Sequence, residues 1–173
     1  MDHQYKEHPA PTGRLVDGQL VPVPESVSAG ATVWLALPTE SGEVQLWEGL
    51  AAHRLTSGDT VEVRAVPLFA YDVNYGDELS VVVSADGTLV GTGIVKDAGN
   101  HTFRLWFPSS ADGDGIRSVV EEFGPLGCLI ESYSTRLIGL SAGPSEAQVV
   151  ADALQAGQTN GRFIYETGRQ HTR

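Results

Sequence analysis

The feature that most constrains the fold is a series of short apolar segments separated by turn sequences in the first part of the chain. Segment 60–67, TVEVRAVP, alternates strictly, with Val61 and Val63 on one face and Glu62 on the other. Alternation with a period of two is typical of a β-strand with one buried face. Similar segments, bounded by turns of Gly, Ser and Asp, are found at 32–38, 43–55, 78–85 and 88–98. Short strands at this spacing predict a small antiparallel β-barrel or curled sheet.

The hydrophobic period changes in the second part of the chain. A strand is expected at 101–108, and apolar residues recur at helical spacing in 115–127 and again in 145–157. Three further strands are expected at 128–134, 135–142 and 161–168. The order β-α-β-β-α-β is that of a ferredoxin-like unit, in which both helices cover one face of a four-stranded sheet. We therefore predict an α+β protein in which the barrel or curled sheet precedes a ferredoxin-like unit.

Composition and pattern divide the chain into four parts. They are a polar, proline-rich arm at 1–30, a barrel-like domain at 31–100, a ferredoxin-like domain at 101–168 and a tail at 169–173. Within the arm, the pair Asp17-Gly18 lies between two Leu-Val pairs, a pattern typical of a type I′ hairpin. Proline-rich polar termini are also often loose, so a hairpin and a loose arm are both open at this stage.

The net charge of −11 over 173 residues limits the partners that the chain can bind. The acidity is concentrated in residues 1–100, which contain 14 acidic residues against 5 Lys and Arg. Phosphate backbones are repelled by such a surface, so we expect no nucleic-acid partner. A strongly acidic surface favours solubility, and it complements a basic protein partner.

Cysteine content and hydropathy bear on the compartment. Cys128 is the only cysteine, so an internal disulfide is excluded and a reducing compartment is the simplest interpretation. No apolar run reaches the length of about 18 residues that a membrane span needs. The first residues, MDHQYKEHPAP, lack the apolar core of a secretory signal. We therefore expect a cytoplasmic protein with no membrane partner.

The candidate binding residues cluster in segment 66–79, VPLFAYDVNYGDEL, where aromatic and acidic residues are dense. One interpretation is a corner of the barrel whose rings pack in the core. The other is a platform for a peptide or a small ligand. Trp106 is expected on the sheet face opposite the helices, where the barrel or a second copy would pack. The candidate ligand- or partner-binding residues are Phe69, Tyr71, Asp72, Asn74, Tyr75, Asp77, His101 and Trp106.

The remaining titratable groups give little support for catalysis. His53 and His101 are candidates for acid–base work, but their spacing does not require it. Cys128 follows a helix C-terminus, which does not lower the pKa of a thiol, so we expect it to be buried and unreactive. No zinc, calcium, phosphate-loop or dinucleotide spacing is present, so we predict no metal, no cofactor and no catalytic residue. The histidines expected to be solvated near the termini are His3, His8 and His171.

Three motifs resemble the DUF4265 family of bacterial proteins. They are the W-E-G-L corner at 47–50, the V-P-x-F-A-x-x-V-x-Y-G-D core at 66–77 and the F-R-x-x-F-P strand at 103–108. The resemblance runs over residues 31–168. The family has no established activity, so the resemblance implies no substrate, no cofactor and no catalytic residue.

Two functional hypotheses follow from the sequence. The first is a non-catalytic, acidic interaction protein, of the immunity or regulatory type, that binds a basic protein. The alternative is a small-molecule binding protein or modest enzyme with a pocket where the barrel meets the ferredoxin-like sheet. The second hypothesis predicts a concave site lined by Tyr71, Tyr75 and Trp106. A homodimer through the ferredoxin-like sheet is a further option for its assembly.

Overall fold

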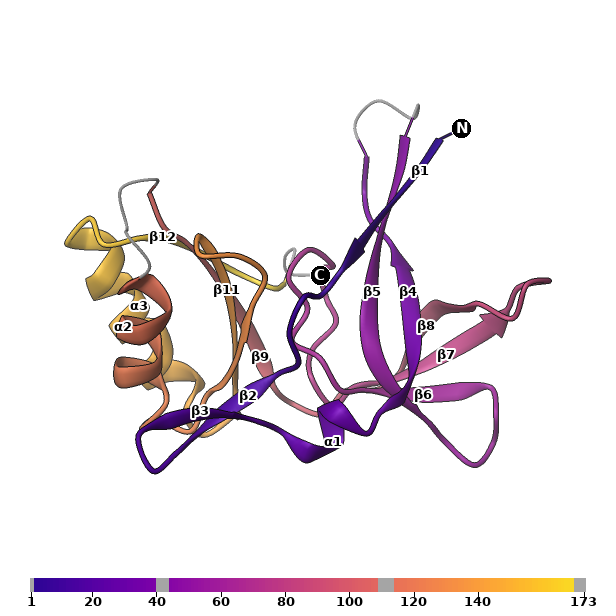
Figure 1. The fold of residues 1–173 in the computed structure, drawn as a ribbon, viewed down its shortest axis with the longest axis horizontal. Coiled ribbons are helices and arrows are strands. Elements are labelled where there is room, and N and C mark those ends of the chain that lie inside the picture. The colour runs from indigo at the N-terminus through magenta and orange to yellow at the C-terminus, as the bar shows by residue number, and fades with distance from the viewer. Residues whose placement is uncertain (1, 40–43, 109–113, 170–173) are drawn as a thin grey trace.

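The computed structural model describes residues 2–39, 44–108 and 114–169 of the chain (Figure 1). His171 and most of the tail therefore lie outside the described residues. Within these ranges the strands form two sheets of six strands each. Figure 1 shows two helices covering the outer face of one sheet, and the other sheet curling up on its opposite side. The mixed α+β class with a barrel and a second sheet is confirmed.

The first sheet contains the barrel. Its strands, in spatial order, are β1 (Asp2–Glu7), β5 (Val44–Arg54), β4 (Gly30–Ala36), β8 (Leu89–Lys96), β7 (Glu78–Val83) and β6 (Thr60–Val63). Strand β5 also pairs with β6, which closes the last five strands into a barrel. Val61 and Val63 are fully buried while Glu62 between them is only partly buried, as the alternation of segment 60–67 predicts. The barrel core is therefore built by the inward positions of short amphipathic strands.

The second sheet carries the helices. Its strands, in spatial order, are β12 (Ile164–Thr167), β9 (His101–Trp106), β11 (Leu137–Ala142), β10 (Leu129–Ser132), β2 (Gly13–Val16) and β3 (Gln19–Pro22). Helices α2 (Asp114–Phe123) and α3 (Ala147–Thr159) pack on one face, where Phe123, Val150 and Leu154 are buried with Leu105 and Ile138 of the sheet. This sheet is wider than the predicted four strands, because the N-terminal arm adds β2 and β3.

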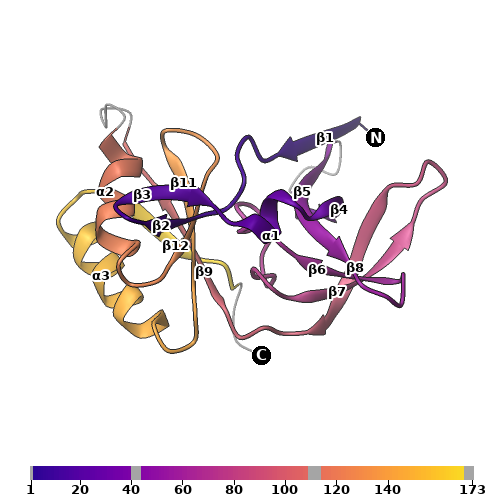
Figure 2. The ribbon, with the colours of Figure 1, turned by 60° about the horizontal axis from the view of Figure 1, so that its bottom comes forward.

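The N-terminal arm is more ordered than its polar sequence indicates. Of the two alternatives, the hairpin is the one observed: β2 and β3 pair around Asp17 and Gly18, whose φ angles of 49° and 79° suit a type I′ turn. Strand β1, which the sequence did not predict, runs parallel to β5 of the barrel. A short helix, α1 (Pro24–Val27), then leads to β4. Figure 2 shows the arm passing from the barrel to the second sheet and back.

Helix α3 extends past the position where the sequence placed its end. The helical pattern in the sequence runs over 145–157 and ends at Gly157, but α3 continues to Thr159. A Cβ at Gly157 would collide with the ring of Phe163, which is buried under the helix. Because Gly157 has no side chain, the helix can pack closely on the aromatic ring of Phe163. None of the helices in the described ranges has the length and apolar character needed to cross a membrane.

Candidate functional site

Residues 64–77, here called the junction segment, lie between the two sheets. The segment connects β6 to β7 and has no strand pairing of its own. Gly139 of β11 makes room for it, since a Cβ at that position would lie 2.7 Å from Leu68 and 3.0 Å from Val66. The backbone amides of this segment must find partners other than a sheet, because unpaired buried N–H groups are costly.

Glu48 supplies three of those partners from the middle of β5. Its side chain is fully buried. One carboxylate oxygen accepts hydrogen bonds from the amides of Leu68 at 2.6 Å and Phe69 at 3.1 Å, and the other accepts from Ala70 at 2.6 Å. A buried carboxylate is tolerated where donors surround it in this way. Glu48 thereby fixes the path of the junction segment against the barrel.

Glu131 plays the corresponding part on the second sheet. It lies on β10 and is 1% exposed. Its Oε2 accepts a hydrogen bond from the amide of Val66 at 2.8 Å and another from the hydroxyl of Thr12 in the arm. The two glutamates come from different sheets and hold neighbouring stretches of one segment.

His8 joins the two carboxylates. Its Nε2 lies 2.8 Å from Glu48, and its Nδ1 contacts Glu131. Carboxylates only accept hydrogen bonds, so this geometry assigns a proton to both ring nitrogens. Burial alone lowers the pKa of His8, but hydrogen bonds and charges from Glu131 and Glu48 outweigh it and raise the pKa from 6.5 to about 9. The expectation that His8 is solvated is wrong: its side chain is 7% exposed.

Arg104 holds the same segment from β9. Its guanidinium is 1% exposed and donates to the carbonyl oxygens of Pro67, at 3.3 Å, and Ala70. It also pairs with Glu166 at 3.1 Å. The ring of Tyr71 lies 4.5 Å from the guanidinium carbon, and the phenol donates to Glu166. The junction segment is thus bound through its amides by two acids and through its carbonyls by one base.

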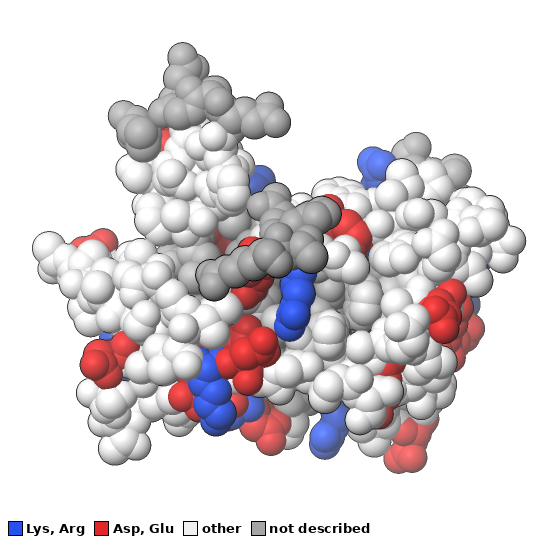
Figure 3. Space-filling model, turned by 180° about the vertical axis from the view of Figure 1, so that it is seen from behind, with Lys and Arg blue, Asp and Glu red and all other residues white. Residues whose placement is uncertain are grey.

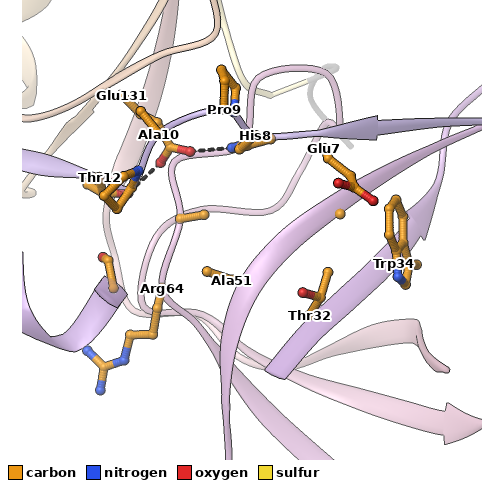
Figure 4. Close-up of a pocket in the computed structure, with 14 residues that line it drawn as sticks. Glu7, His8, Pro9, Ala10, Thr12, Thr32, Trp34, Ala51, Arg64 and Glu131 are labelled. Carbon is orange, nitrogen blue, oxygen red and sulfur yellow. Dashed lines mark hydrogen bonds and ion pairs between the residues drawn. The ribbon is translucent and has the colours of Figure 1, made fainter. Parts of the chain in front are cut away.

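A pocket of about 330 Å³ lies beside this network, between the arm, β4, β5 and the start of the junction segment (Figure 4). The side chains that matter for its chemistry are His8, Thr12, Ser26, Trp34, Arg64 and Glu131. We call it the junction pocket. Figure 4 shows Glu131 and His8 along one side, Trp34 at one end and Arg64 at the other.

Two polar atoms at the junction pocket are left without partners within the described residues. Ser26 is 5% exposed, and its hydroxyl has no hydrogen-bond partner there. The Nε of Arg64 is likewise buried and unpaired there, while its guanidinium binds Glu62 through another nitrogen at 2.8 Å. Buried donors are normally satisfied, so unpaired donors that line a pocket mark the place where a ligand atom would be held.

The aromatic candidates from the sequence fall in several environments. Phe69 packs edge-on against Tyr133 with the ring centroids 5.0 Å apart, and Tyr75 is buried at 8% exposure. Tyr71 and Asp72 line a second pocket of about 320 Å³, together with Gly91 and Ile94 of β8. The structure therefore separates Tyr71 from Tyr75 and brings neither to the junction pocket.

Asn74 and Asp77 are buried and bind backbone groups. Asp77 accepts hydrogen bonds from the amides of Asn74 and Ala98, both at 2.8 Å. Burial raises the pKa of Asp77, and these hydrogen bonds oppose the rise. Asn74 in turn accepts from the amide and hydroxyl of Thr102 on β9. Both side chains connect the junction segment to its surroundings.

His101 and Trp106 lie at the two ends of β9. Trp106 is 44% exposed and pairs across the strands with Ile164, on the face away from the helices as expected. His101 is partly buried opposite Ala142. Within the described residues, neither side chain lines the junction pocket or the pocket beside Tyr71.

Sequence reasoning missed the residues that organise the junction. They are His8, Thr12, Ser26, Glu48, Arg64, Arg104 and Glu131. One signal was available for Glu48 and Glu131, because each is a charged residue that directly follows a large apolar residue within a strand. Such residues are almost never fully buried unless they are paired. Their partners are 20 to 123 positions away, and no local spacing indicates them.

Cys128 lies in an environment that does not activate its thiol. Cys128 is 1% exposed, and burial raises the pKa of its thiol to about 12, with a further contribution from Glu146. The expectation of a buried, unreactive thiol agrees with this environment. Across residues 2–39, 44–108 and 114–169, no group of three or more His, Cys, Asp or Glu is arranged to hold a metal ion.

Comparison with known proteins gives a family and a fold. A family model described as "Domain of unknown function (DUF4265)" matches residues 48–165. No curated protein matches the chain. A solved structure described as a "Novel crystal structure of a hypothetical protein from Neisseria gonorrhoeae" is similar, with a TM-score of 0.65 and 14% sequence identity. The match covers 83% of this chain and 96% of that one. At this identity the likeness shows the fold alone.

Proposed function

We propose a ligand-binding function without catalysis for this chain, which belongs to the DUF4265 family. The binding site is the junction pocket, and its ligand is a small polar molecule that carries a hydrogen-bond acceptor. This is the alternative hypothesis from the sequence with a different binding site. The proposed site is lined by the residues around His8 and not by Tyr71, Tyr75 and Trp106.

The observation that carries the proposal is the presence of two unpaired donors among the residues that line the pocket. Ser26 Oγ and Arg64 Nε are both buried, and both lack a partner in the described part of the chain. A ligand with acceptor groups would supply partners for such donors, and the indole of Trp34, at the end of the pocket opposite Arg64, offers an apolar face. The volume of about 330 Å³ is at the small end of the range for ligand pockets.

The absence of catalysis rests on the state of the groups that could perform it. Both nitrogens of His8 are already bound to carboxylates, so the ring has no free lone pair to act as a base. The oxygens of Glu131 are taken by His8, Thr12 and Val66. These groups shape and rigidify the wall of the pocket, which favours binding by reducing the entropy lost on association.

The test is a binding experiment with the purified protein. Wild type is equilibrated with a small-molecule extract, and retained compounds are identified by mass spectrometry after desalting. We expect a retained compound that Ser26→Ala and Arg64→Lys release, because each variant removes one of the unpaired donors. Arg54→Lys, a matched change at an exposed arginine, serves as the control. Retention of nothing by wild type, or of the same compound by all variants, would contradict the proposal.

A second candidate function is favoured by charge. The net charge of −11 supports a basic protein partner. Figure 3 shows the molecule from behind, and acidic groups are spread over both halves of the visible face among fewer basic ones. In a low-salt affinity capture, a basic partner that elutes with rising salt would favour this function. Capture that is insensitive to salt would count against it.

We also propose a ferredoxin-like unit, a homodimer and a cytoplasmic location for this protein. The order β12-β9-β11-β10, with helices α2 and α3 between strands, supports a ferredoxin-like unit in residues 101–168. The exposed pair Trp106 and Ile164 supports a homodimer through that sheet. The single, buried cysteine supports a cytoplasmic location.

A further inference from the structure

A third pocket lies on the outer face of the barrel, next to the junction pocket. It has a volume of about 430 Å³ and is lined by Tyr5, Trp34 and Trp47 with Glu7 and Asp86, besides Ser84, Thr88 and Val90. We call it the aromatic groove. Glu7 and Trp34 also line the junction pocket, so the two hollows adjoin, but Tyr5, Trp47 and Asp86 belong to the aromatic groove alone.

Strand register places the three rings on one face. Tyr5 of β1 is the direct partner of Trp47 on β5, and Trp34 of β4 is the partner of Gly49, two residues further along β5. Residues two apart on a strand point to the same side, so the rings come from three adjacent strands on the outer surface. Glu7 is also paired with Gly49 and therefore shares this face.

Packing holds the rings in place. The indole of Trp34 lies directly on Gly49, where a Cβ would be only 2.8 Å from the ring. Tyr5 meets Trp34 edge-on, with a centroid distance of 5.1 Å and an interplanar angle of 81°. Trp47 donates its indole N–H to Nδ1 of His3 at 2.9 Å. The rings of Tyr5 and Trp34 are nearly perpendicular, and the indole of Trp47 is the third ring. The three rings therefore form the walls of the groove and not a flat stack.

The polar groups of the groove are acidic. Asp86 accepts hydrogen bonds from the hydroxyl of Ser84 and the amide of Thr88, and these bonds lower its pKa. Glu7 contributes a second carboxylate, and Figure 4 shows it beside Trp34. Among the residues that line the groove, there is no Lys or Arg. A cation is therefore the charge that this surface favours.

We propose that the aromatic groove binds a quaternary ammonium group. The faces of aromatic rings attract cations, and a trimethylammonium group suits ring walls because it has no N–H to leave unpaired. The two carboxylates balance its charge without needing to accept a hydrogen bond. The same head group is found in free choline-like molecules and in trimethylated lysine side chains, so the experiment must distinguish these sources.

The first experiment compares choline with 3,3-dimethyl-1-butanol, which has the same shape and no charge. Binding is followed by the fluorescence of Trp34 and Trp47. We expect choline to quench saturably and the neutral isostere to bind at least about tenfold more weakly, because the cation–ring attraction requires the charge. No saturable quenching by choline or by a trimethyllysine peptide, or equal binding of choline and the isostere, would overturn the proposal.

Variants and a peptide complete the test. Trp47→Leu and Glu7→Gln should each weaken binding about 3- to 30-fold, while Trp106→Phe on the second sheet should leave it unchanged. Wild-type affinity in both groove variants would contradict the proposed site. Tighter binding of a trimethyllysine peptide than of choline would show that the trimethylammonium group comes from a protein. Tighter binding of choline would show that it comes from a small molecule. Ser26→Ala should leave choline binding unaffected, which separates this site from the junction pocket.

Discussion

Nε2 of His8 lies 2.8 Å from Oε1 of Glu48, and this contact joins the N-terminal arm to strand β5 of the barrel. The other ring nitrogen binds Glu131 on the second sheet. One imidazolium therefore connects the arm and both sheets. Its charge is buried between two carboxylates, and an ion in such a place is stable only while its partners remain ionised and correctly placed.

The pH dependence of stability should reveal the charge on His8. Its pKa is raised to about 9 in the folded protein from 6.5, so its contribution is fully present below pH 6.5 and is lost as the pH rises through 9. We expect the free energy of unfolding to fall by about 3 kcal/mol from this group between pH 6.5 and 9.5. Urea unfolding at a series of pH values measures it.

His53→Gln is the matched control for that experiment. His53 is exposed on β5, and its replacement should leave the pH profile unchanged. His8→Gln should remove the fall between pH 6.5 and 9.5 and lower the stability at pH 6.5. An unchanged profile in His8→Gln would show that His8 does not bind its proton more tightly in the folded state.

Removing the charge of Glu48 should be strongly destabilising. Gln has one acceptor oxygen instead of two, so Glu48→Gln leaves at least one of the three amides or His8 without its partner. We expect a loss of about 3–5 kcal/mol in the free energy of unfolding, measured by urea denaturation at pH 7. Glu121→Gln makes the same change on the exposed face of α2 and should cost less than about 0.5 kcal/mol. Equal losses would refute the assigned role of Glu48.

Arg104 should not tolerate replacement by lysine. Its guanidinium binds the carbonyls of Pro67 and Ala70 with different nitrogens, and a single ammonium cannot reproduce this arrangement. We expect Arg104→Lys to lower the free energy of unfolding by about 2–4 kcal/mol. Arg117→Lys on the surface of α2 is the control, since its side chain is 75% exposed. Thermal and urea unfolding of both variants would decide the point.

Close packing at Gly139 gives a prediction that involves no charge. A Cβ there would enter the space of Leu68 and Val66, which are buried and cannot move freely. Gly139→Ala should therefore destabilise the fold by about 1–3 kcal/mol and disturb the junction segment. Gly93→Ala in β8 is the control, because its nearest contact at 3.7 Å is ordinary. A stable Gly139→Ala variant would mean that the two halves are not tightly packed at this point.

Local patterns predicted most elements and few of the contacts between them. The alternation of Val61, Glu62 and Val63 depends only on neighbours in the chain, and it identified β6, although the strand ends at Val63 and does not reach residue 67. The turn at Asp17-Gly18 was recognisable because a type I′ turn needs two residues that accept positive φ. Strand β1 was missed because its sequence, DHQYKE, is polar and gains its place only by pairing with β5.

The sequence alone determined the mixed α+β class and the barrel in the first half, because these follow from local period and turn chemistry. Its motifs determined the family. Tertiary structure decided which polar residues matter. His8, Glu48 and Glu131 come from three distant segments, and no local spacing indicates that they meet. Their roles arise because burial makes an unpaired charge costly and so requires the three to meet. Hydrophobic periodicity in the sequence does not indicate which buried charges must pair.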